Sequence, residues 1–406
     1  MRVLLAGSGG REHALAWALA RSPRLTSLHA APGNPGIAPL GDCHPVRADD
    51  GEGLLALAHG LEADLVVIGP EAPLVAGVGD ELRHGGITIF GPSRAAARIE
   101  GSKSFAKQLM RDAGVATAET LAVARPPCVV KVDGLAAGKG VFVCHTRDQL
   151  DGALRAAAAF DGPIVIEELL EGDEVSVFAL VDGVSVVPLA PAQDYKRLED
   201  GDAGPNTGGM GSFSPVPAAD GSFAAEIAET VHRPVVEELA RRGTPFVGLL
   251  YAGLMLTAAG PRVLEFNCRF GDPETQSIVP RLESDLLELL AATAAGELAG
   301  VEARFTGDAA VTVAAVAGSY PAEGDVGTPI DGLEEAEAAG ALVFHAGTAS
   351  RGGRVVTNGG RVLGITGLGA TLAEARDRAY AGLGRISFAG MRARTDIAEE
   401  AARVRA

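Results

Sequence analysis

The chain has 406 residues, 47% hydrophobic and 21% charged, a balance typical of globular proteins that excludes disordered and collagen-like chains. At about 100–200 residues per domain, this length predicts two to four domains. Acidic residues exceed basic ones, 35 − 52 = −17, so neither nucleic acid nor an anionic membrane is an expected partner. An anionic substrate would therefore need a local group of basic side chains.

Cysteine spacing and the N-terminal sequence predict a cytoplasmic protein. Cys43, Cys128, Cys144 and Cys268 are far apart and show no metal-ligand spacing, which argues against a zinc site or a disulfide framework. The first residues lack the long apolar core and the cleavage site of a signal peptide. The longest uncharged stretch, residues 243–261, is interrupted by Thr, Gly and Pro and predicts core strands instead of a membrane span.

The first hundred residues alternate strand and helix patterns. A helix is predicted over residues 11–22, and short buried strands are predicted over residues 2–7, 27–33, 63–69 and 87–91. This alternation indicates a parallel sheet covered by helices, with ligands at the carboxyl ends of the strands.

A glycine-rich turn, residues 7–10, joins the first strand to the helix. A dinucleotide-binding GxGxxG pattern would need glycine where Glu12 stands, and no acidic residue follows the second strand, so a nicotinamide site is not expected. Glycine amides at a helix start suit a phosphate on a smaller ligand. A tight turn required only for packing fits this motif equally well.

Lysine occurs only in the middle of the chain, and the other 35 − 5 = 30 basic residues are arginine; the lysines are Lys103, Lys107, Lys131, Lys139 and Lys196. A compact ammonium is typical of phosphate sites, which favours a functional role for these positions. Lys103 and Lys107 are four residues apart in a predicted helix, so an exposed helix face is the alternative. Lys131 lies in a predicted strand, where a charge needs a partner.

A strand, a glycine-rich loop and a second strand are predicted over residues 126–144. The loop is not a P-loop, because Asp133 stands where glycine is required, Gly140 replaces the magnesium-binding hydroxyl, and a strand follows instead of a helix. A hairpin that closes over nucleotide phosphates fits better, with Lys131 in the first strand and Lys139 in the loop. A solvent-exposed hairpin tip is the alternative.

Three strands are predicted over residues 162–190, and the last two are joined at Asp182-Gly183. Backbone groups at residues 167–170 can bind an adenine edge, and the Glu174 carboxylate can accept hydrogen bonds from ribose hydroxyls. Such residues are also common at the surface ends of strands.

The segment 193–217 is too polar and glycine-rich for any regular element and predicts a long functional loop. A hairpin follows, and its second strand carries Glu265 and Asn267, two residues apart and so on one face. Carboxylate and amide oxygens are ligands that Mg²⁺ accepts. A buried, unpaired Glu265 would be costly, so a metal or a cationic partner is expected.

Nine motifs, in order along nearly the whole chain, resemble the phosphoribosylamine–glycine ligase family of ATP-grasp enzymes: GSGGREHALAW, GPEAPLVAG, EGSKSFAK, KVDGLAAGKGV, GPNTGGMGSFSP, LYAGLM, EFNCRFGDPETQ, HAGT and VVTNGGRVL. The resemblance implies an α/β fold of three regions. These are a Rossmann-like (pre-ATP-grasp) domain over 1–100, an ATP-grasp core over 101–305 with a mobile lid subdomain at about 117–187, and a small α+β domain over 306–406.

The family reaction joins glycine to 5-phosphoribosylamine while ATP is cleaved to ADP and phosphate. The resemblance therefore implies a glycyl phosphate intermediate, ATP with Mg²⁺ (or Mn²⁺) as cofactors, glycine and 5-phosphoribosylamine as small-molecule partners, and a monomer. No enzyme nucleophile is required, which agrees with the absence of a GxSxG motif from the sequence.

The resemblance also assigns site residues. Catalytic roles fall to Arg269, Lys131 and Asp194, and metal binding to Glu265 and Asn267. ATP contacts fall to Lys103, Lys131, Gly138, Lys139, Glu167, Glu168, Leu170 and Glu174. Substrate contacts fall to Gly9, Gly10, Lys196, Asn206, Thr207, Gly208, Gly209, Met210, Asp272, Pro273 and Glu274.

Antiparallel strands and a helix are predicted from residue 309 onward, with hairpin turns at 352–353 and 358–360. His345 and Arg361 fit structural positions better than cleft positions. Two rival functions remain. Another ATP-grasp carboxylate–amine ligase would share Lys131, Glu168 and Glu265 but not the GPNTGGMG loop. A non-enzymatic nucleotide-binding protein would bind MgATP without turnover.

Overall fold

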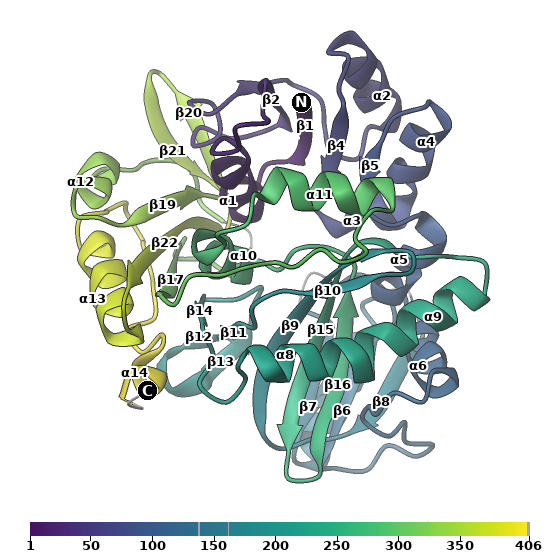
Figure 1. Cartoon of the computed structure of the whole chain (residues 1–406). Helices are drawn as coiled ribbons and strands as arrows, with labels where there is room; N and C mark the ends of the chain where they lie inside the picture. Colours follow the sequence, from purple (N-terminus) through teal and green to yellow (C-terminus); the bar gives the residue numbers. More distant parts are fainter. Residues whose placement is uncertain (137–138, 161, 323, 404–406) are drawn as a thin grey trace.

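The computed structural model describes residues 1–136, 139–160, 162–322 and 324–403. Its mixed α/β architecture contains the parallel N-terminal sheet, the antiparallel core sheet and the antiparallel C-terminal sheet that the sequence predicts (Figure 1). The fold class is therefore confirmed.

The N-terminal sheet is parallel and has the strand order β3-β2-β1-β4-β5. Its buried apolar runs pack under helices because both faces of a parallel sheet are covered. The strands are β1 (Arg2–Gly7), β2 (Ser27–Pro32), β3 (Asp42–Cys43), β4 (Leu65–Ile68) and β5 (Ile89–Phe90). The helices are α1 (Gly10–Leu19), α2 (Gly51–Gly60), α3 (Glu71–Ala76), α4 (Val78–His84) and α5 (Arg94–Gly101).

The antiparallel core sheet has the order β10-β9-β15-β16. The predicted hairpins are confirmed, and their strands are β9 (Asp173–Asp182), β10 (Val186–Pro188), β15 (Val247–Thr257) and β16 (Gly260–Asn267). The helices of this part of the chain are α6 (Lys103–Asp112), α8 (Gly221–Ile227), α9 (Arg233–Arg241), α10 (Glu274–Ile278) and α11 (Leu286–Ala295). The Ser102 side chain caps α6 by accepting a hydrogen bond from the Phe105 amide.

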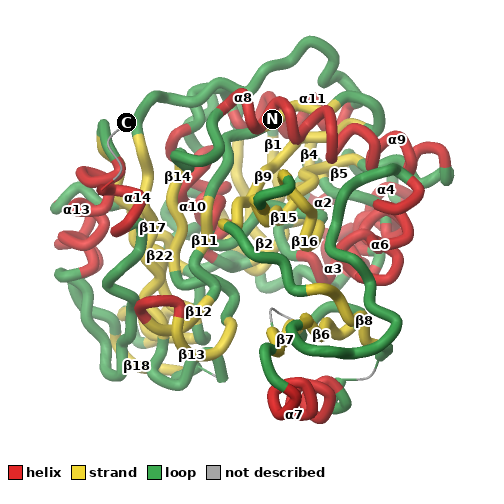
Figure 2. The backbone as a smooth tube through the Cα atoms, turned by 90° about the horizontal axis from the view of Figure 1, so that it is seen from below, coloured by secondary structure: helices red, strands yellow, loops and turns green. Residues whose placement is uncertain are grey.

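A separate antiparallel sheet, β7-β6-β8, carries one helix and lies within the region 117–187 for which the lid subdomain is predicted. Its elements are β6 (Cys128–Val132), β7 (Val141–Cys144), α7 (Arg147–Ala157) and β8 (Ile164–Glu168). Apolar residues of these elements form a small hydrophobic core of their own. Figure 2 shows α7 and the three strands at one side of the molecule.

The C-terminal sheet corrects one prediction. The segment 193–217 is not devoid of regular structure, because it contains the short strands β11 (Gln193–Asp194), β12 (Arg197–Glu199), β13 (Ala203–Asn206) and β14 (Gly211–Ser214). Strands β11 and β14 join the C-terminal sheet, whose order is β11-β14-β17-β22-β19. Pairing with β17 (Ala309–Val316) provides the hydrogen bonds that composition alone did not predict.

The rest of the C-terminal region follows the predicted pattern of antiparallel strands and one main helix. The predicted hairpin at 352–353 is present, but the strands on either side of 358–360 belong to different sheets, so the hairpin predicted there is wrong. Strands β18, β21 and β20 form a second small sheet. The elements are β18 (Val326–Pro329), α12 (Leu333–Ala338), β19 (Leu342–His345), β20 (Thr348–Arg351), β21 (Arg354–Asn358), β22 (Arg361–Gly369), α13 (Leu372–Leu383) and α14 (Glu399–Arg403).

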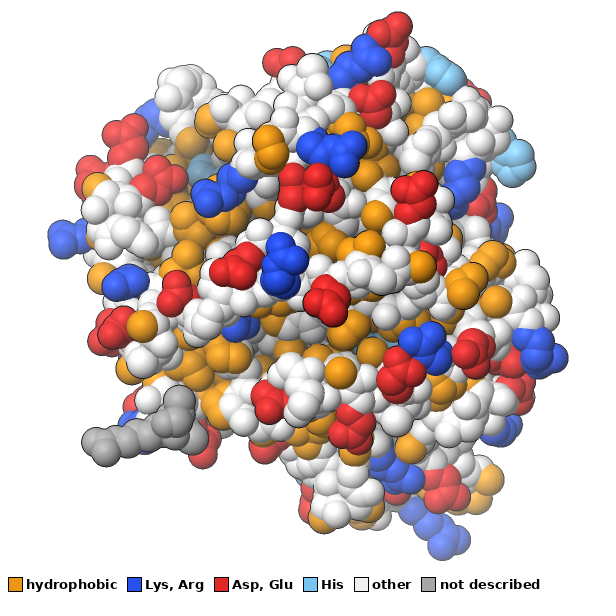
Figure 3. Space-filling model, in the orientation of Figure 1, with side chains coloured by type: hydrophobic (Ala, Val, Ile, Leu, Met, Phe, Trp, Pro, Cys, Tyr) orange, Lys and Arg blue, Asp and Glu red, His pale blue; other side chains and the backbone are white. Residues whose placement is uncertain are grey.

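On the face seen in Figure 3, acidic and basic side chains are interspersed. Among the helices that the structure describes, none is long and apolar enough to cross a membrane. The four cysteines are free thiols.

Candidate active site

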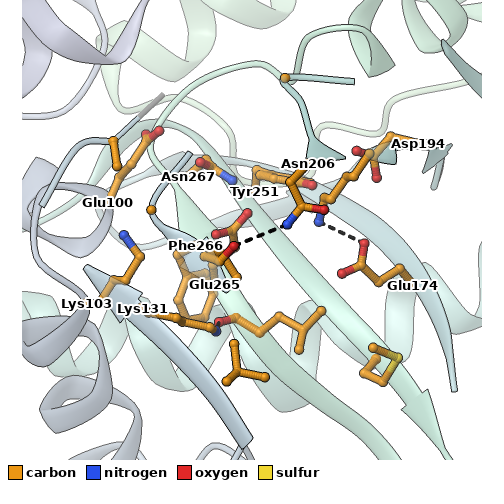
Figure 4. A pocket seen from close by; sticks show the side chains of 18 of the residues that line it. Glu100, Lys103, Lys131, Glu174, Asp194, Asn206, Tyr251, Glu265, Phe266 and Asn267 are labelled. Carbon is orange, nitrogen blue, oxygen red and sulfur yellow. Dashed lines mark hydrogen bonds and ion pairs between the residues drawn. The ribbon is translucent and has the colours of Figure 1, made fainter. Parts of the chain in front are cut away.

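A cavity of about 630 Å³ lies where the lid, the core sheet, the N-terminal domain and the C-terminal sheet meet (Figure 4). Sixteen of the predicted site residues line it: Lys103, Lys131, Glu167, Glu168, Leu170, Glu174, Asp194, Lys196, Asn206, Thr207, Gly208, Glu265, Asn267, Arg269, Asp272 and Glu274. Lys131, Glu168 and Glu265, which belong to three different strands, therefore share one cavity.

Several predicted residues lie elsewhere. Lys139 is exposed in the lid loop and is not part of the cavity wall, and Gly138 falls outside the described residues. Gly9 lines a second cavity of about 570 Å³. The cavity linings do not include Gly10, Gly209, Met210 or Pro273.

Two lysines hold the buried carboxylate of Glu167. Lys107 Nζ lies 2.9 Å from Glu167 Oε1, and Lys131 Nζ lies 2.8 Å from Oε2. Lys107 also donates to Thr117 Oγ1 at 2.9 Å and to the Ala118 carbonyl at 2.5 Å, so its three protons are all used. Lys107 therefore supports Glu167, whereas Lys131 keeps one proton for a ligand after its bond to the Leu264 carbonyl.

Burial distinguishes Lys107 from an exposed helix lysine. Its side chain is only 7% exposed, and burial lowers its pKa, while the Glu167 carboxylate raises it. Sequence analysis left its role open, because spacing of four residues from Lys103 fits either face of a helix.

The neighbouring glutamates also have cationic partners. Arg262 Nη1 lies 2.6 Å from Glu168 Oε1, which also accepts the Glu119 amide at 2.8 Å. Lys196 Nζ lies 2.8 Å from Glu174 Oε2 and links the segment after β11 to β9. Burial would lower the pKa of Lys196, but the carboxylates of Glu174 and Asp194 raise it well above its usual value. This ammonium therefore stays charged.

Asp194 lies at the acidic side of the cavity. Burial raises its pKa to about 8, and the carboxylates of Glu274 and Glu174 add to this effect while Lys196 opposes it. Glu274 itself accepts a hydrogen bond from the Tyr251 hydroxyl at 3.1 Å. Asp194 therefore keeps its proton to a higher pH than an ordinary aspartate does.

Glu265 and Asn267 project from β16 into the same space as Lys103 and Lys131 (Figure 4). Burial would raise the pKa of Glu265, but the ammonium groups of Lys196, Lys131 and Lys103 lower it, so the carboxylate is ionised. These are the cationic neighbours that the sequence predicted for a buried Glu265. A carboxylate with an amide oxygen provides two hard donors, which fits Mg²⁺ when nucleotide phosphates supply further ligands. The described residues contain no group of three His, Cys, Asp or Glu donors for a metal.

Arg269 is held by two carboxylates that sequence analysis missed. Its Nε lies 3.1 Å from Glu71 Oε2 and its Nη2 lies 3.3 Å from Glu100 Oε1. Burial would raise the pKa of Glu71, but Arg269 and Arg11 lower it to about 2. Glu71 and Glu100 come from the N-terminal domain, and the sequence signal for Glu71 is the GPEAPLVAG motif.

Arg361 is a cleft residue, contrary to the structural position favoured by the sequence. It lines both cavities, as does Asp272, and Nη2 lies 3.1 Å from Asp272 Oδ2. Its Nη1 donates to the Asp272 carbonyl at 2.7 Å and to the Gly208 carbonyl. It thus connects β22 to the GPNTGGMG segment and to the segment after β16.

The glycine-rich turn after β1 packs around the Glu12 carboxylate. The Gly9 amide donates to Glu12 Oε2 at 2.6 Å. A Cβ added at Gly7, Gly9 or Gly69 would lie within 3.0 Å of the Glu12 side chain, so these positions have no room for one. The packing role predicted as one alternative is therefore present, and a phosphate could use the Gly9 amide only by replacing Glu12.

His345 lies at the contact between the N-terminal and C-terminal domains. Its amide donates to His13 Nδ1 at 2.8 Å, and its carbonyl accepts from Asn34 Nδ2 at 2.8 Å. This is the structural position that the sequence favoured.

The arrangement combines ammonium groups, two hard metal donors and the half-buried guanidinium of Arg269 in one cavity. Such a site can neutralise the charge of a nucleoside triphosphate and align it with a second anion.

Comparison with known proteins identifies the family. Models of the phosphoribosylglycinamide synthetase N domain, ATP-grasp (A) domain and C domain match residues 1–100, 101–275 and 310–400. The chain belongs to the phosphoribosylglycinamide synthetase family.

Relatives named phosphoribosylamine–glycine ligase align over almost the whole chain. The phosphoribosylamine–glycine ligase of Streptomyces coelicolor is 53% identical and covers 99% of this chain and 100% of its own length. That of Mesorhizobium japonicum is 47% identical over 99% of this chain and 98% of its own.

Solved structures of other proteins have the same fold as this chain. The phosphoribosylamine–glycine ligase of Thermotoga maritima superposes with a TM-score of 0.85 at 35% identity, over 98% of this chain and all of its own. The biotin carboxylase domain of Hydrogenobacter thermophilus 2-oxoglutarate carboxylase shares the fold, with a TM-score of 0.71 at 16% identity, over 97% of this chain and 91% of its own.

Proposed function

We propose that this chain ligates glycine to 5-phosphoribosylamine, giving glycinamide ribonucleotide, ADP and phosphate in purine biosynthesis. The observation that carries the proposal is the full-length match to three consecutive domains of the phosphoribosylglycinamide synthetase family. The cavity contains charged groups suited to both ATP and an anionic substrate.

The proposed chemistry follows from the poor reactivity of a carboxylate toward an amine. The γ-phosphoryl group of ATP passes to a glycine carboxylate oxygen and forms glycyl phosphate and ADP. The nitrogen of phosphoribosylamine then attacks the acyl carbon and phosphate leaves, so a carbon–nitrogen bond replaces the acyl–oxygen bond. The protein supplies position and charge in this sequence, not a nucleophile.

Nucleotide binding is assigned to the lid side of the cavity. The ATP phosphates would be contacted by Lys131, Lys103, Lys139 and Gly138, of which Gly138 lies outside the described residues. Glu167, Glu168 and Leu170 would hold adenine, and Glu174 the ribose. Support comes from the shared cavity wall and from Lys131, which retains a proton beyond its two described bonds.

Glu265 and Asn267 would hold Mg²⁺ or Mn²⁺. When bound, the ion neutralises phosphate charge. The fit rests on the ionised state of the half-buried Glu265 and on the side-by-side position of the two donors on β16.

Glycine and phosphoribosylamine are assigned to the side of the cavity formed by the segment 194–211 and the residues after β16. Arg269 would stabilise the acyl phosphate, with Asp194 as a further catalytic residue. The ribosyl phosphate would extend toward the second cavity, where Arg361 and Asp272 belong to both linings. Gly9 lines that second cavity as well. The main cavity is bordered by Lys196, Asn206, Thr207, Gly208 and Glu274. Gly209, Met210 and Pro273 are next to these residues in the sequence, and Gly10 follows Gly9.

A coupled assay for ADP release tests the proposal. ADP release should require both glycine and freshly prepared phosphoribosylamine, and other amino acids and amines should not replace them. Release with another acid–amine pair would favour a different ATP-grasp ligase, and ATP binding without turnover would favour a non-enzymatic role. Arg269→Ala should lower turnover by about a hundredfold or more, as loss of a charged transition-state contact does. Turnover within a few-fold of the parent would exclude the role given to Arg269.

We further propose that the enzyme acts as a monomer, as the family resemblance implies, and that it works in the cytoplasm, where its four free cysteines stay reduced. Light scattering at working concentration tests the oligomeric state.

A further inference from the structure

Residues 197–206, which are part of the segment 194–211 assigned to substrate binding, form only a small sheet of their own. Residues 200–205 are exposed, and strands β12 and β13 pair only with each other in a two-stranded sheet. Gly201 and Asp202 both have positive φ, at 66° and 52°. A non-glycine residue in this conformation persists only when surrounding contacts hold it.

The chain segment before α14 supplies such contacts through Arg394. This side chain is 1% exposed. Its Nη1 donates to Asp202 Oδ1 at 2.8 Å and to the Arg197 carbonyl at 3.1 Å. Its Nε and Nη2 bind the two oxygens of Asp396 at 2.7 and 2.6 Å.

The guanidinium also lies over an aromatic ring of the same segment. Arg394 Cζ is 4.7 Å from the ring centroid of Tyr195. A planar guanidinium can stack and form several directed hydrogen bonds at once, whereas an ammonium cannot.

Residues next to Arg394 extend the contact. The Thr395 amide and hydroxyl donate to the two oxygens of Asp200, at 2.8 and 2.5 Å. The Gly201 amide donates to Asp396 Oδ2 at 2.8 Å, and the Ala398 amide donates to the Tyr195 hydroxyl at 3.0 Å. The segment 394–398 thus binds the outer side of the segment 195–202 along its length.

Tyr195 connects this outer contact to the cavity. Its chain neighbours Asp194 and Lys196 line the cavity wall. Its amide donates to the Gly211 carbonyl at 3.0 Å, and its carbonyl accepts from the Met210 amide at 2.7 Å. The Lys196 carbonyl accepts from the Thr207 amide at 2.7 Å. Displacement of Tyr195 would therefore move both flanking side chains and the GPNTGGMG segment together.

We propose that Arg394 is a positioning residue for the substrate side of the active site. It acts through Tyr195 and Asp202, fixes the segment 194–211, and has no direct contact with substrate. This inference rests on the proposed function for the identity of the substrates, but the mechanical role of Arg394 does not depend on it.

Steady-state kinetics of full-length variants test the proposal. Arg394→Met should raise the KM for glycine or phosphoribosylamine about tenfold or more, because several charge-assisted contacts are lost, and leave the KM for MgATP within about twofold. Arg394→Lys keeps the positive charge but lacks the planar guanidinium with its several donors. Its KM values should lie between those of Arg394→Met and those of the parent. Arg403→Met, an exposed arginine nearby, is the control and should match the parent.

Hydrogen exchange provides a readout that needs no turnover. Amides of residues 197–206 should exchange faster in Arg394→Met than in the parent and in Arg403→Met. If Arg394→Met does not fold, Asp200→Asn and Asp202→Asn should show smaller changes of the same kind. Because Asp202 also lines the cavity wall, the KM comparison uses Asp200→Asn, whose exposed side chain lies outside that wall, and both variants are used for hydrogen exchange.

Arg394→Met with unchanged substrate KM values and unchanged exchange would overturn the proposal. So would unchanged Asp200→Asn and Asp202→Asn variants if Arg394→Met is unfolded. A parent enzyme that releases no ADP with glycine and phosphoribosylamine would contradict the proposed function alone, and the exchange experiment would still decide the role of Arg394.

Discussion

Arg361 Nη2 lies 3.1 Å from Asp272 Oδ2, and this ion pair belongs to the wall of both cavities. The two residues come from β22 and from the segment after β16, so the pair joins two domains at the point where the cavities meet.

Arg361→Met should raise the KM for phosphoribosylamine about tenfold to a hundredfold, since a hydrogen bond to a charged group contributes about 1.5–3 kcal/mol. The KM for MgATP should stay within about twofold. Initial rates with each substrate varied in turn measure both constants. Arg354→Met removes an exposed arginine of β21 and serves as the control. Equal KM values in Arg361→Met and the parent would place the ribosyl phosphate elsewhere.

Lys107→Met should lower the free energy of unfolding by up to about 3 kcal/mol, because Glu167 would lose one of two buried cationic partners. Urea denaturation measures this change. Lys139→Met removes an exposed lysine and should change stability by less than about 0.5 kcal/mol. The double variant Lys107→Met/Glu167→Gln should be no more stable than Lys107→Met, because the buried Lys131 then loses its carboxylate partner as well. If the single variant is as stable as Lys139→Met, the ion pair contributes nothing.

Glu265→Gln should raise the Mg²⁺ concentration for half-maximal turnover about tenfold or more, because a neutral amide replaces an ionised ligand. Excess chelator should abolish turnover of the parent, and added Mg²⁺ or Mn²⁺ should restore it. Metal titrations of turnover measure the shift, with Glu297→Gln, at an exposed position, as the matched substitution. A parent-like metal dependence of Glu265→Gln would contradict the proposed metal site.

His13 and His345 should make the folded protein sensitive to acid. Burial lowers the pKa of His13 to about 3 and that of His345 to about 4, both below the unfolded value of about 6.5. Each histidine therefore binds a proton more readily in the unfolded chain. Its contribution is complete above pH 6.5 and declines as the pH falls toward the folded pKa, by about 2 kcal/mol per histidine between pH 7.5 and pH 5.

His13→Asn keeps an acceptor for the His345 amide but does not titrate. Its free energy of unfolding should fall less between pH 7.5 and pH 5 than that of the parent. Denaturation at the two pH values measures the difference. His59→Gln, at an exposed position, should behave like the parent. An identical pH dependence of His13→Asn and the parent would refute the assignment.

The sequence was informative where a short segment determines the outcome. Glu265 and Asn267 share a face because strand residues two apart always do, and the hairpin that carries them has clear apolar runs. Lys131 in a buried strand required a partner, and Glu167 provides it. The ATP-grasp fold itself followed from resemblance to a family, not from periodicity.

Long-range contacts account for what sequence reasoning missed. Lys107 looks like an exposed helix lysine until β8 places Glu167 beside it, 60 residues later in the chain. Arg361 pairs with Asp272, 89 residues earlier in the chain, and no local sequence pattern at either residue predicts this pairing. In the polar segment 193–217, β14 forms because it pairs with β17, a contact that composition cannot reveal.

The pairing of β14 with β17 also has a consequence for synthesis of the protein. Residues 211–214 leave the ribosome about a hundred residues before residues 310–313, to which they are hydrogen-bonded. The nascent chain must therefore carry β14 with one edge unpaired until its last quarter emerges. Truncated translation products that end before β17 should retain that exposed edge and depend on chaperones or be degraded.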